Sequence, residues 1–137
     1  MKKIFLLLAL SLNIVLANDN YELQLYEAIL PSIFSDTPIK IYGDREIRAV
    51  LQNSTKFTFS QKCDSSVLLI IGRNFKKLSP ECQNKPVFST SYKWSKHHKN
   101  SIGSFYWRKG RPQLRFKKSG FKLFNLKLPY KLIKYAK

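Results

Sequence analysis

The sequence predicts an α/β fold, a single small domain with a mainly parallel sheet, covering helices and a C-terminal antiparallel hairpin. The apolar run 66–71 is closed by Gly72, as expected for a central strand buried on both faces of a parallel sheet. Strand-like and helix-like segments alternate up to residue 90, which indicates β-α-β units. Two alternating segments then flank a turn at Lys109–Pro112, which is typical of a hairpin.

The first half of the chain is expected to begin with a helix over residues 19–34, which starts with the spacing of a capping box and is shortened by Pro31. Gly43 and Asp44 should form a turn, with Asp44 capping a second helix. A short helix is expected over 73–78. The strands expected in this half cover residues 38–42, 57–60, 66–71 and 85–90.

The second half is more polar, and a loop is expected over residues 92–101. The hairpin strands should span 104–108 and 113–117, and Pro129 should start a last short helix. The side chains expected to point outward from the hairpin are Gln113, Arg115 and Lys117. Those expected to face the core are Leu114, Phe116, Phe121, Phe124, Leu128, Leu132, Ile133 and Ala136.

Residues 1–17 have the pattern of a secretory signal peptide. Lys2 and Lys3 precede an apolar run over 4–16, and Ala17 supplies the small residue that signal peptidase needs. The run is shorter than the roughly 20 residues of a membrane span. We therefore expect a signal peptide over 1–17 and one α/β periplasmic domain over 18–137. A buried core helix is the alternative.

The positive charge is concentrated in the second half of the chain. The formal net charge is +17, and all eight Asp and Glu residues lie at or before position 81. Residues 82–137 carry fifteen Lys and Arg and no acid. This asymmetry favours an anionic partner, such as lipid head groups, nucleic acid or an acidic protein surface. Compositional drift toward Lys is the alternative.

The sequence contains two cysteines, Cys63 and Cys82. In an oxidising compartment this number indicates one disulfide, worth about 3 kcal/mol for a loop of roughly 20 residues. Two unpaired buried thiols are the alternative. A zinc site is disfavoured, since the neighbouring His97 and His98 cannot easily turn to one metal.

No enzyme motif stands out, because the sequence lacks a nucleophile elbow, a helical metal-binding His pair and a Gly-rich phosphate loop. We expect a non-enzymatic protein without a cofactor or metal. The segment 105–118 interleaves aromatic and cationic residues, as single-stranded nucleic-acid platforms do, but export argues against nucleic acid. An anionic membrane surface is a second candidate partner, and a homodimer is left open. The residues expected to contact a partner or membrane are Lys93, Lys96, Lys99, Arg108, Lys109 and Arg111.

A small-molecule or anion-binding protein, resembling one lobe of a periplasmic solute receptor, is the alternative function. Ligands of parallel sheets gather beyond the carboxyl ends of the strands. The small and polar residues expected there are Gly43, Asp44, Ser89 and Ser91.

Several segments also carry a family resemblance, and they come in a characteristic order. They are Tyr21–Tyr26 with Ile33-Phe34, Ile39–Gly43, Cys63 followed by Val67–Gly72, Ile102–Tyr106, Arg111–Phe116 and Leu128–Ala136. In order and hydrophobic pattern they resemble the YfiR-like periplasmic proteins of Gram-negative bacteria. The best-known member represses a membrane diguanylate cyclase by binding its periplasmic sensor region, with disulfides controlling its competence. The resemblance implies a periplasmic regulator that binds the extracytoplasmic region of an inner-membrane signalling protein, of the diguanylate cyclase or sensor kinase type.

Overall fold

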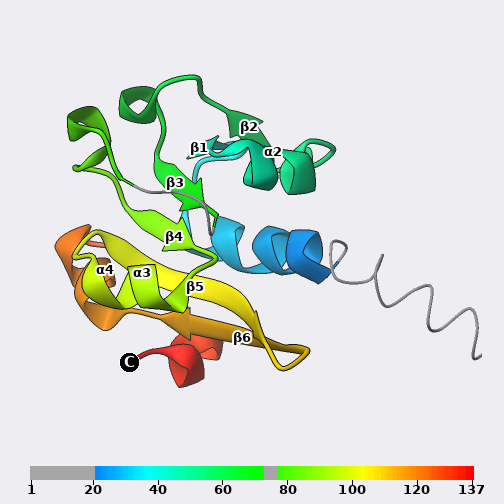
Figure 1. Cartoon of the computed structure of the whole chain (residues 1–137), viewed down its shortest axis with the longest axis vertical. Coiled ribbons are helices and arrows are strands. Elements are labelled where there is room, and N and C mark those ends of the chain that lie inside the picture. The colour runs from blue at the N-terminus through cyan, green and yellow to red at the C-terminus, as the bar shows by residue number, and fades with distance from the viewer. Residues whose placement is uncertain (1–20, 73–76) are drawn as a thin grey trace, which may run out of the picture.

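The computed structural model describes residues 21–72 and 77–137. Its sheet has six strands in the order β2-β1-β3-β4-β5-β6, which runs from top to bottom in Figure 1. Neighbouring strands are parallel except for the antiparallel pair β5 and β6. The strands are β1 (Ile39–Gly43), β2 (Phe57–Phe59), β3 (Leu68–Ile71), β4 (Val87–Ser89), β5 (Ser101–Arg108) and β6 (Arg111–Phe116). The predicted fold class, α/β with a mainly parallel sheet and a C-terminal hairpin, is confirmed.

Helices lie on both faces of this sheet. A helix over residues 21–33 confirms the prediction there, while its expected start and the expected signal peptide lie outside the described residues. The other helices are α2 (Arg45–Leu51), α3 (Tyr92–His97) and α4 (Lys118–Leu123), with 3₁₀ turns η1 (Cys63–Ser65), η2 (Pro80–Cys82) and η3 (Tyr130–Tyr135). Within the described ranges, no helix is long and apolar enough to cross a membrane.

Strand β3 divides the core into two clusters. Its four side chains are all buried, as predicted for a central strand. Leu68 and Ile70 belong to the larger cluster, which includes side chains of the 21–33 helix, α2 and α4. Leu69 and Ile71 belong to the smaller cluster on the other face, with both cysteines. Each such side chain contributes about 1.5–3 kcal/mol by leaving water, so β3 anchors both layers.

The loop predicted over residues 92–101 is wrong, because α3 occupies most of it and β5 begins at Ser101. Ser91 caps the helix by accepting a hydrogen bond from the Trp94 amide at 3.2 Å. The Lys117 ammonium donates to three carbonyls at the other end of α3, those of residues 95, 96 and 98. Only Ser95 of the helix is buried, so the sequence shows no apolar period over this segment.

The hairpin turn is two residues shorter than predicted. Arg108 pairs with Arg111, and Lys109 and Gly110 have φ of 51° and 74°. Positive φ at both central residues is the geometry of a tight type I′ turn, whose twist matches that of the flanking strands. Pro112 consequently lies within β6, which is tolerated because β6 is an edge strand.

Two other predictions differ from the structure. Of the helix expected over 73–78, residues 73–76 lie outside the described part of the chain, and residues 77–79 are not helical. The last helix is the 3₁₀ turn η3, in which Ile133 is 49% exposed and so does not face the core. The tighter 3₁₀ winding, with three residues per turn, eclipses side chains three apart. The remaining predicted core residues of this region pack against the larger cluster, namely Phe121, Phe124, Leu128, Leu132 and Ala136.

Candidate functional site

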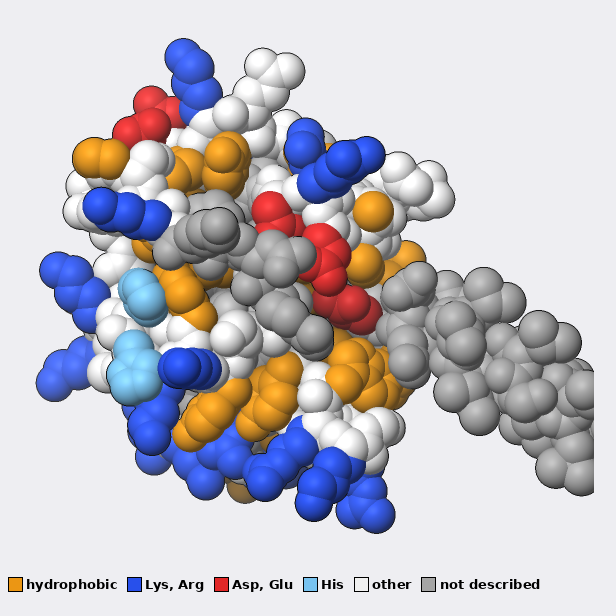
Figure 2. Space-filling view, viewed as in Figure 1, with side chains coloured by type: hydrophobic (Ala, Val, Ile, Leu, Met, Phe, Trp, Pro, Cys, Tyr) orange, Lys and Arg blue, Asp and Glu red, His pale blue; other side chains and the backbone are white. Residues whose placement is uncertain are grey.

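The sheet order converts the charge asymmetry of the sequence into a spatial one. Strands β2, β1 and β3 come from the half of the chain that carries the acids, and β4, β5 and β6 from the half that carries most of the Lys and Arg. Figure 2 shows Lys and Arg gathered over the lower part of the molecule, around α3 and the hairpin, while the acidic side chains on this face lie at and above its centre.

The structure places the predicted contact residues at two ends of the hairpin, and all six are exposed. Lys93 and Lys96 lie on α3, and Lys99 follows it. Arg108, Lys109 and Arg111 form the tip of the hairpin. The tip is four residues along β5 from Ser104, or about 13 Å at the rise of a strand.

An aromatic cluster lies between these two groups. Tyr92 of α3 meets Tyr106 of β5 with ring centroids 5.5 Å apart, and the Arg115 guanidinium lies 4.9 Å from the centroid of the Tyr92 ring. Tyr92 is 39% exposed. We define the basic face as this cluster (Tyr92, Tyr106 and Arg115) together with Lys93, Lys96, Arg108, Lys109 and Arg111.

A cavity of about 150 Å³ opens under the basic face, between α3 and the hairpin. Ser104 lines it, is 1% exposed, and its hydroxyl has no hydrogen-bond partner among the described residues. An unpaired buried hydroxyl costs about 1–3 kcal/mol. Arg115 also lines the cavity and stands directly opposite Ser104 in the antiparallel register.

Lys117 lines the same cavity, but its ammonium is used by the fold. It donates to the carbonyls of Ser95, Lys96 and His98 at 3.1, 3.4 and 2.8 Å. Partial burial lowers the pKa of Lys117 from its ordinary value, because desolvation disfavours the charged form. Lys117 therefore ties α3 to the hairpin. The other cationic residues that line the cavity are Lys96, Arg115 and Lys137.

Sequence reasoning named the basic residues of this face but missed Tyr92, Ser104, Tyr106 and Arg115 as a group. The outward alternation predicted for Gln113, Arg115 and Lys117 was the available signal. It did not reveal the group, because the segment that contains Tyr92 was expected to be a loop.

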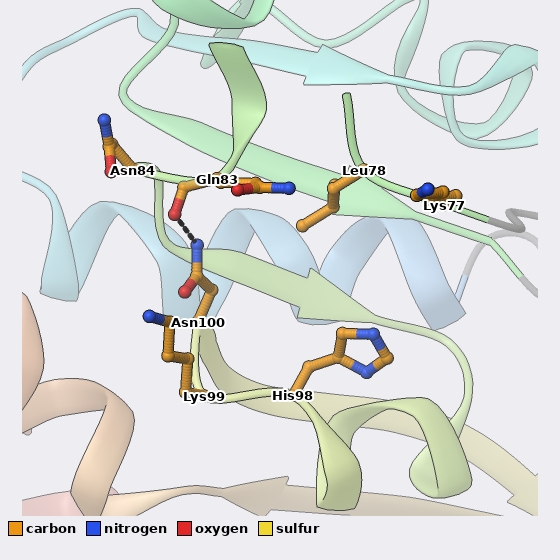
Figure 3. Close-up of a pocket in the computed structure, with 7 residues that line it drawn as sticks. All are labelled: Lys77, Leu78, Gln83, Asn84, His98, Lys99 and Asn100. Atoms are coloured by element: carbon orange, nitrogen blue, oxygen red, sulfur yellow. Dashed lines mark hydrogen bonds between the residues drawn. The ribbon is translucent and has the colours of Figure 1, made fainter. Parts of the chain in front are cut away.

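Figure 3 shows a second, larger cavity of about 430 Å³ at the loop between α3 and β5. Asn100 donates to the carbonyl of Gln83, drawn as a dashed line, and to that of Lys85 at 3.2 Å. The His98 ring stacks on Trp94 with centroids 3.9 Å apart. Because these polar groups hold the turns together, they serve the fold. Lys99 lines this cavity and is therefore separate from the basic face.

The residues predicted at the carboxyl ends of the strands lie at one edge of the sheet, with β3 between β1 and β4, and their polar side chains are engaged. Asp44 accepts from the amide of Ile47 at 3.1 Å and from that of Gly72 at 2.6 Å. Ser89 accepts from the Ser91 amide at 2.9 Å, and Ser91 caps α3. The Asp44 carboxylate at this edge would repel an anion. Ligand binding at Gly43, Asp44, Ser89 and Ser91 stays a prediction.

Cys63 and Cys82 form a disulfide, with their Cα atoms 5.1 Å apart. The bond joins η1 to η2, and both of its residues are buried: Cys63 is 3% exposed and Cys82 is 2% exposed. It packs against Leu69 and Ile71 in the smaller cluster. The predicted pairing is confirmed. Among the residues that the structure describes, no group of three His, Cys, Asp or Glu side chains is placed to hold a metal ion.

No protein-family model matches the chain, and no curated protein matches it. The resemblance to the YfiR-like proteins stays a prediction.

Proposed function

We propose that this chain is an exported, non-enzymatic regulator whose basic face binds the extracytoplasmic region of an inner-membrane signalling protein. The receptor would be of the diguanylate cyclase or sensor kinase type, as the resemblance to YfiR-like proteins implies. The observation that supports the proposal is the cluster of exposed Tyr92 with the partly buried Tyr106 and Arg115, flanked by the exposed cations of α3 and the hairpin tip.

The composition of this face favours a protein partner over a lipid surface. Tyr and Arg are the residue types that contribute most at protein interfaces, since they provide large contact areas and directional hydrogen bonds. Attraction to anionic lipid needs only clustered charge, which Lys supplies as well as Arg. The aromatic rings would strengthen membrane binding only if they inserted into the lipid. The Arg115 guanidinium lies over the Tyr92 ring, which opposes such insertion.

Charge also selects the chemistry of the partner. Two copies of the basic face would repel each other, so a homodimer would need a different surface. An acidic surface on the receptor would raise the association rate by electrostatic steering, and added salt would reduce that rate.

The test is a crosslinking pull-down from native membranes with two variants of equal charge change. The first replaces Arg108, Lys109 and Arg111 with Glu, at an exposed turn. The matched control replaces exposed Lys40, Lys56 and Lys62 with Glu. These control residues lie near β1 and β2, and β2 is five strand spacings, or about 24 Å, from β6.

We expect wild type and the control to recover the same inner-membrane signalling protein, and the hairpin variant to lose at least about 90% of that recovery. Equal loss in both variants would mean that net charge, not the basic face, drives the capture. Recovery of no inner-membrane protein by wild type would count against the proposed function itself.

A further inference from the structure

We infer that the cavity between α3 and the β5–β6 hairpin binds a small free oxyanion of the phosphate or carboxylate class. The site lies beneath the basic face, but a free ion could fill it whether or not the proposed receptor exists. Its donors would be the Arg115 guanidinium and the Ser104 hydroxyl, and the exposed residues Lys96 and Lys137 also line it.

The buried hydroxyl of Ser104 is the first observation that points to a ligand. It lines the cavity and has no hydrogen-bond partner among the described residues. Buried hydroxyls are almost always paired in folded proteins. The neighbouring Ser95 and Ser101 hydroxyls illustrate this, because they bond to each other. An oxyanion in the cavity would give Ser104 the acceptor that it lacks.

The second observation is the state of Arg115. Its guanidinium has no hydrogen bond or ion pair to another described residue and rests against the Tyr92 ring. Stacking on a ring fixes the plane of the guanidinium while leaving its edge N–H groups free. Because Ser104 and Arg115 are directly paired across the two strands, both donors can reach one bound group. An arginine fork suits the two oxygens of a carboxylate or phosphate.

The dimensions of the cavity suit a small ligand. A volume of about 150 Å³ is of the order of the liquid volume of five waters. Phosphate, acetate or a short dicarboxylate fits in such a space. Gly103 forms part of the wall, and a Cβ there would overlap the carbonyl oxygen of Arg115, so the backbone is closely packed at this point.

The experiment measures binding of inorganic phosphate and of acetate to the purified chain by calorimetry and thermal unfolding, at constant ionic strength in chloride. The site variants are Ser104→Ala and Arg115→Gln. The matched control is Arg108→Gln, which removes the same charge from the exposed end of the same hairpin. Phosphate and acetate are compared because each class of oxyanion would identify a different physiological ligand.

We expect one of the two probes to bind wild type and Arg108→Gln with equal affinity, and to bind Arg115→Gln at least 10-fold more weakly. Ser104→Ala should also bind that probe more weakly than wild type, because it lacks one of the two donors. Equal weakening in Arg108→Gln and Arg115→Gln would overturn the site in favour of general charge attraction. Absence of binding by both probes, or an affinity of Arg115→Gln equal to that of wild type, would overturn it outright. None of these outcomes bears on receptor capture, which fails or succeeds separately.

Discussion

Breaking the disulfide between Cys63 and Cys82 should lower the free energy of unfolding by about 3 kcal/mol. The two residues are 19 apart in sequence, and the chain-entropy model gives about this value for a closed loop of roughly 20 residues. The magnitude is a large part of the 5–15 kcal/mol that ordinarily holds a domain together. Reduction in place leaves the same side chains packed against Leu69 and Ile71, so it isolates the effect of the crosslink.

The measurement is urea unfolding of oxidised and reduced wild type, followed by circular dichroism. With a slope of about 2 kcal/mol per molar urea, the midpoint should fall by about 1.5 M. The double variant with both cysteines changed to Ala should fall further, by about 1 kcal/mol more, because it also loses buried volume. A reduced protein whose free energy of unfolding lies within about 0.5 kcal/mol of that of the oxidised form would refute the reasoning.

Free-thiol labelling of the exported, unfolded protein tests the compartment. If both cysteines react without reductant, the result would contradict export to an oxidising environment.

Three further predictions concern single side chains. Asp44→Ala should lower the free energy of unfolding in urea by about 2–4 kcal/mol, because it removes the cap of α2 and leaves the Gly72 amide without its acceptor. Gly120→Ala should cost about 3 kcal/mol or more in the same assay, because its Cβ would overlap a backbone carbonyl of β5. The pKa of Tyr26 is raised above its ordinary value of 10.0, mainly because the phenol is buried and secondly because the Glu22 carboxylate is close. Tyr26 therefore ionises at a lower pH in the unfolded state than in the folded state, so the free energy of unfolding should fall as pH rises above about 10. Tyr26→Phe should cost about 1 kcal/mol at neutral pH through its lost hydrogen bond, and that deficit should shrink between neutral pH and pH of about 11 in urea unfolding.

Matched substitutions test whether these effects are local. Arg45→Ala changes the exposed neighbour of Asp44 and should stay within about 0.5 kcal/mol of wild type. Gly110→Asn introduces a side chain where nothing lies within 4 Å, in a backbone region that Asn tolerates, and should be similarly mild. Tyr106→Phe is the control for Tyr26. A deficit for Tyr26→Phe that does not change with pH would contradict the raised pKa.

The parts of the fold that sequence predicted correctly depend on local signals. The β3 strand was recognised because buried parallel strands are continuously apolar, and the α2 cap because Asp44 directly precedes the helix. The α3 helix was missed because only Ser95 is buried on it. One of the interactions that hold α3 comes from Lys117, some twenty residues later, and no local pattern reveals it.

The candidate site was missed for a related reason, which is register. A turn over Lys109–Pro112 would have placed Ser104 opposite Lys117, whereas the two-residue turn places it opposite Arg115. A shift of two residues keeps every side chain on its predicted face but changes its partner. The sequence could therefore predict a basic outer face on the hairpin, but it could not predict that Arg115 is the residue opposite Ser104.

Strand order determines how the charge asymmetry would act. A chain with acids in one half and cations in the other could still fold into a molecule with mixed surfaces if its strands interleaved. Here β2, β1 and β3 occupy one end of the sheet and β4, β5 and β6 the other, so the charge halves stay apart. Such a molecule would be oriented by the electric field of an acidic receptor before contact, with the hairpin end of the sheet facing the receptor. The hairpin substitutions should therefore slow association more than they speed dissociation, and salt of about 0.5 M should remove most of the difference in association rate between wild type and the hairpin variant.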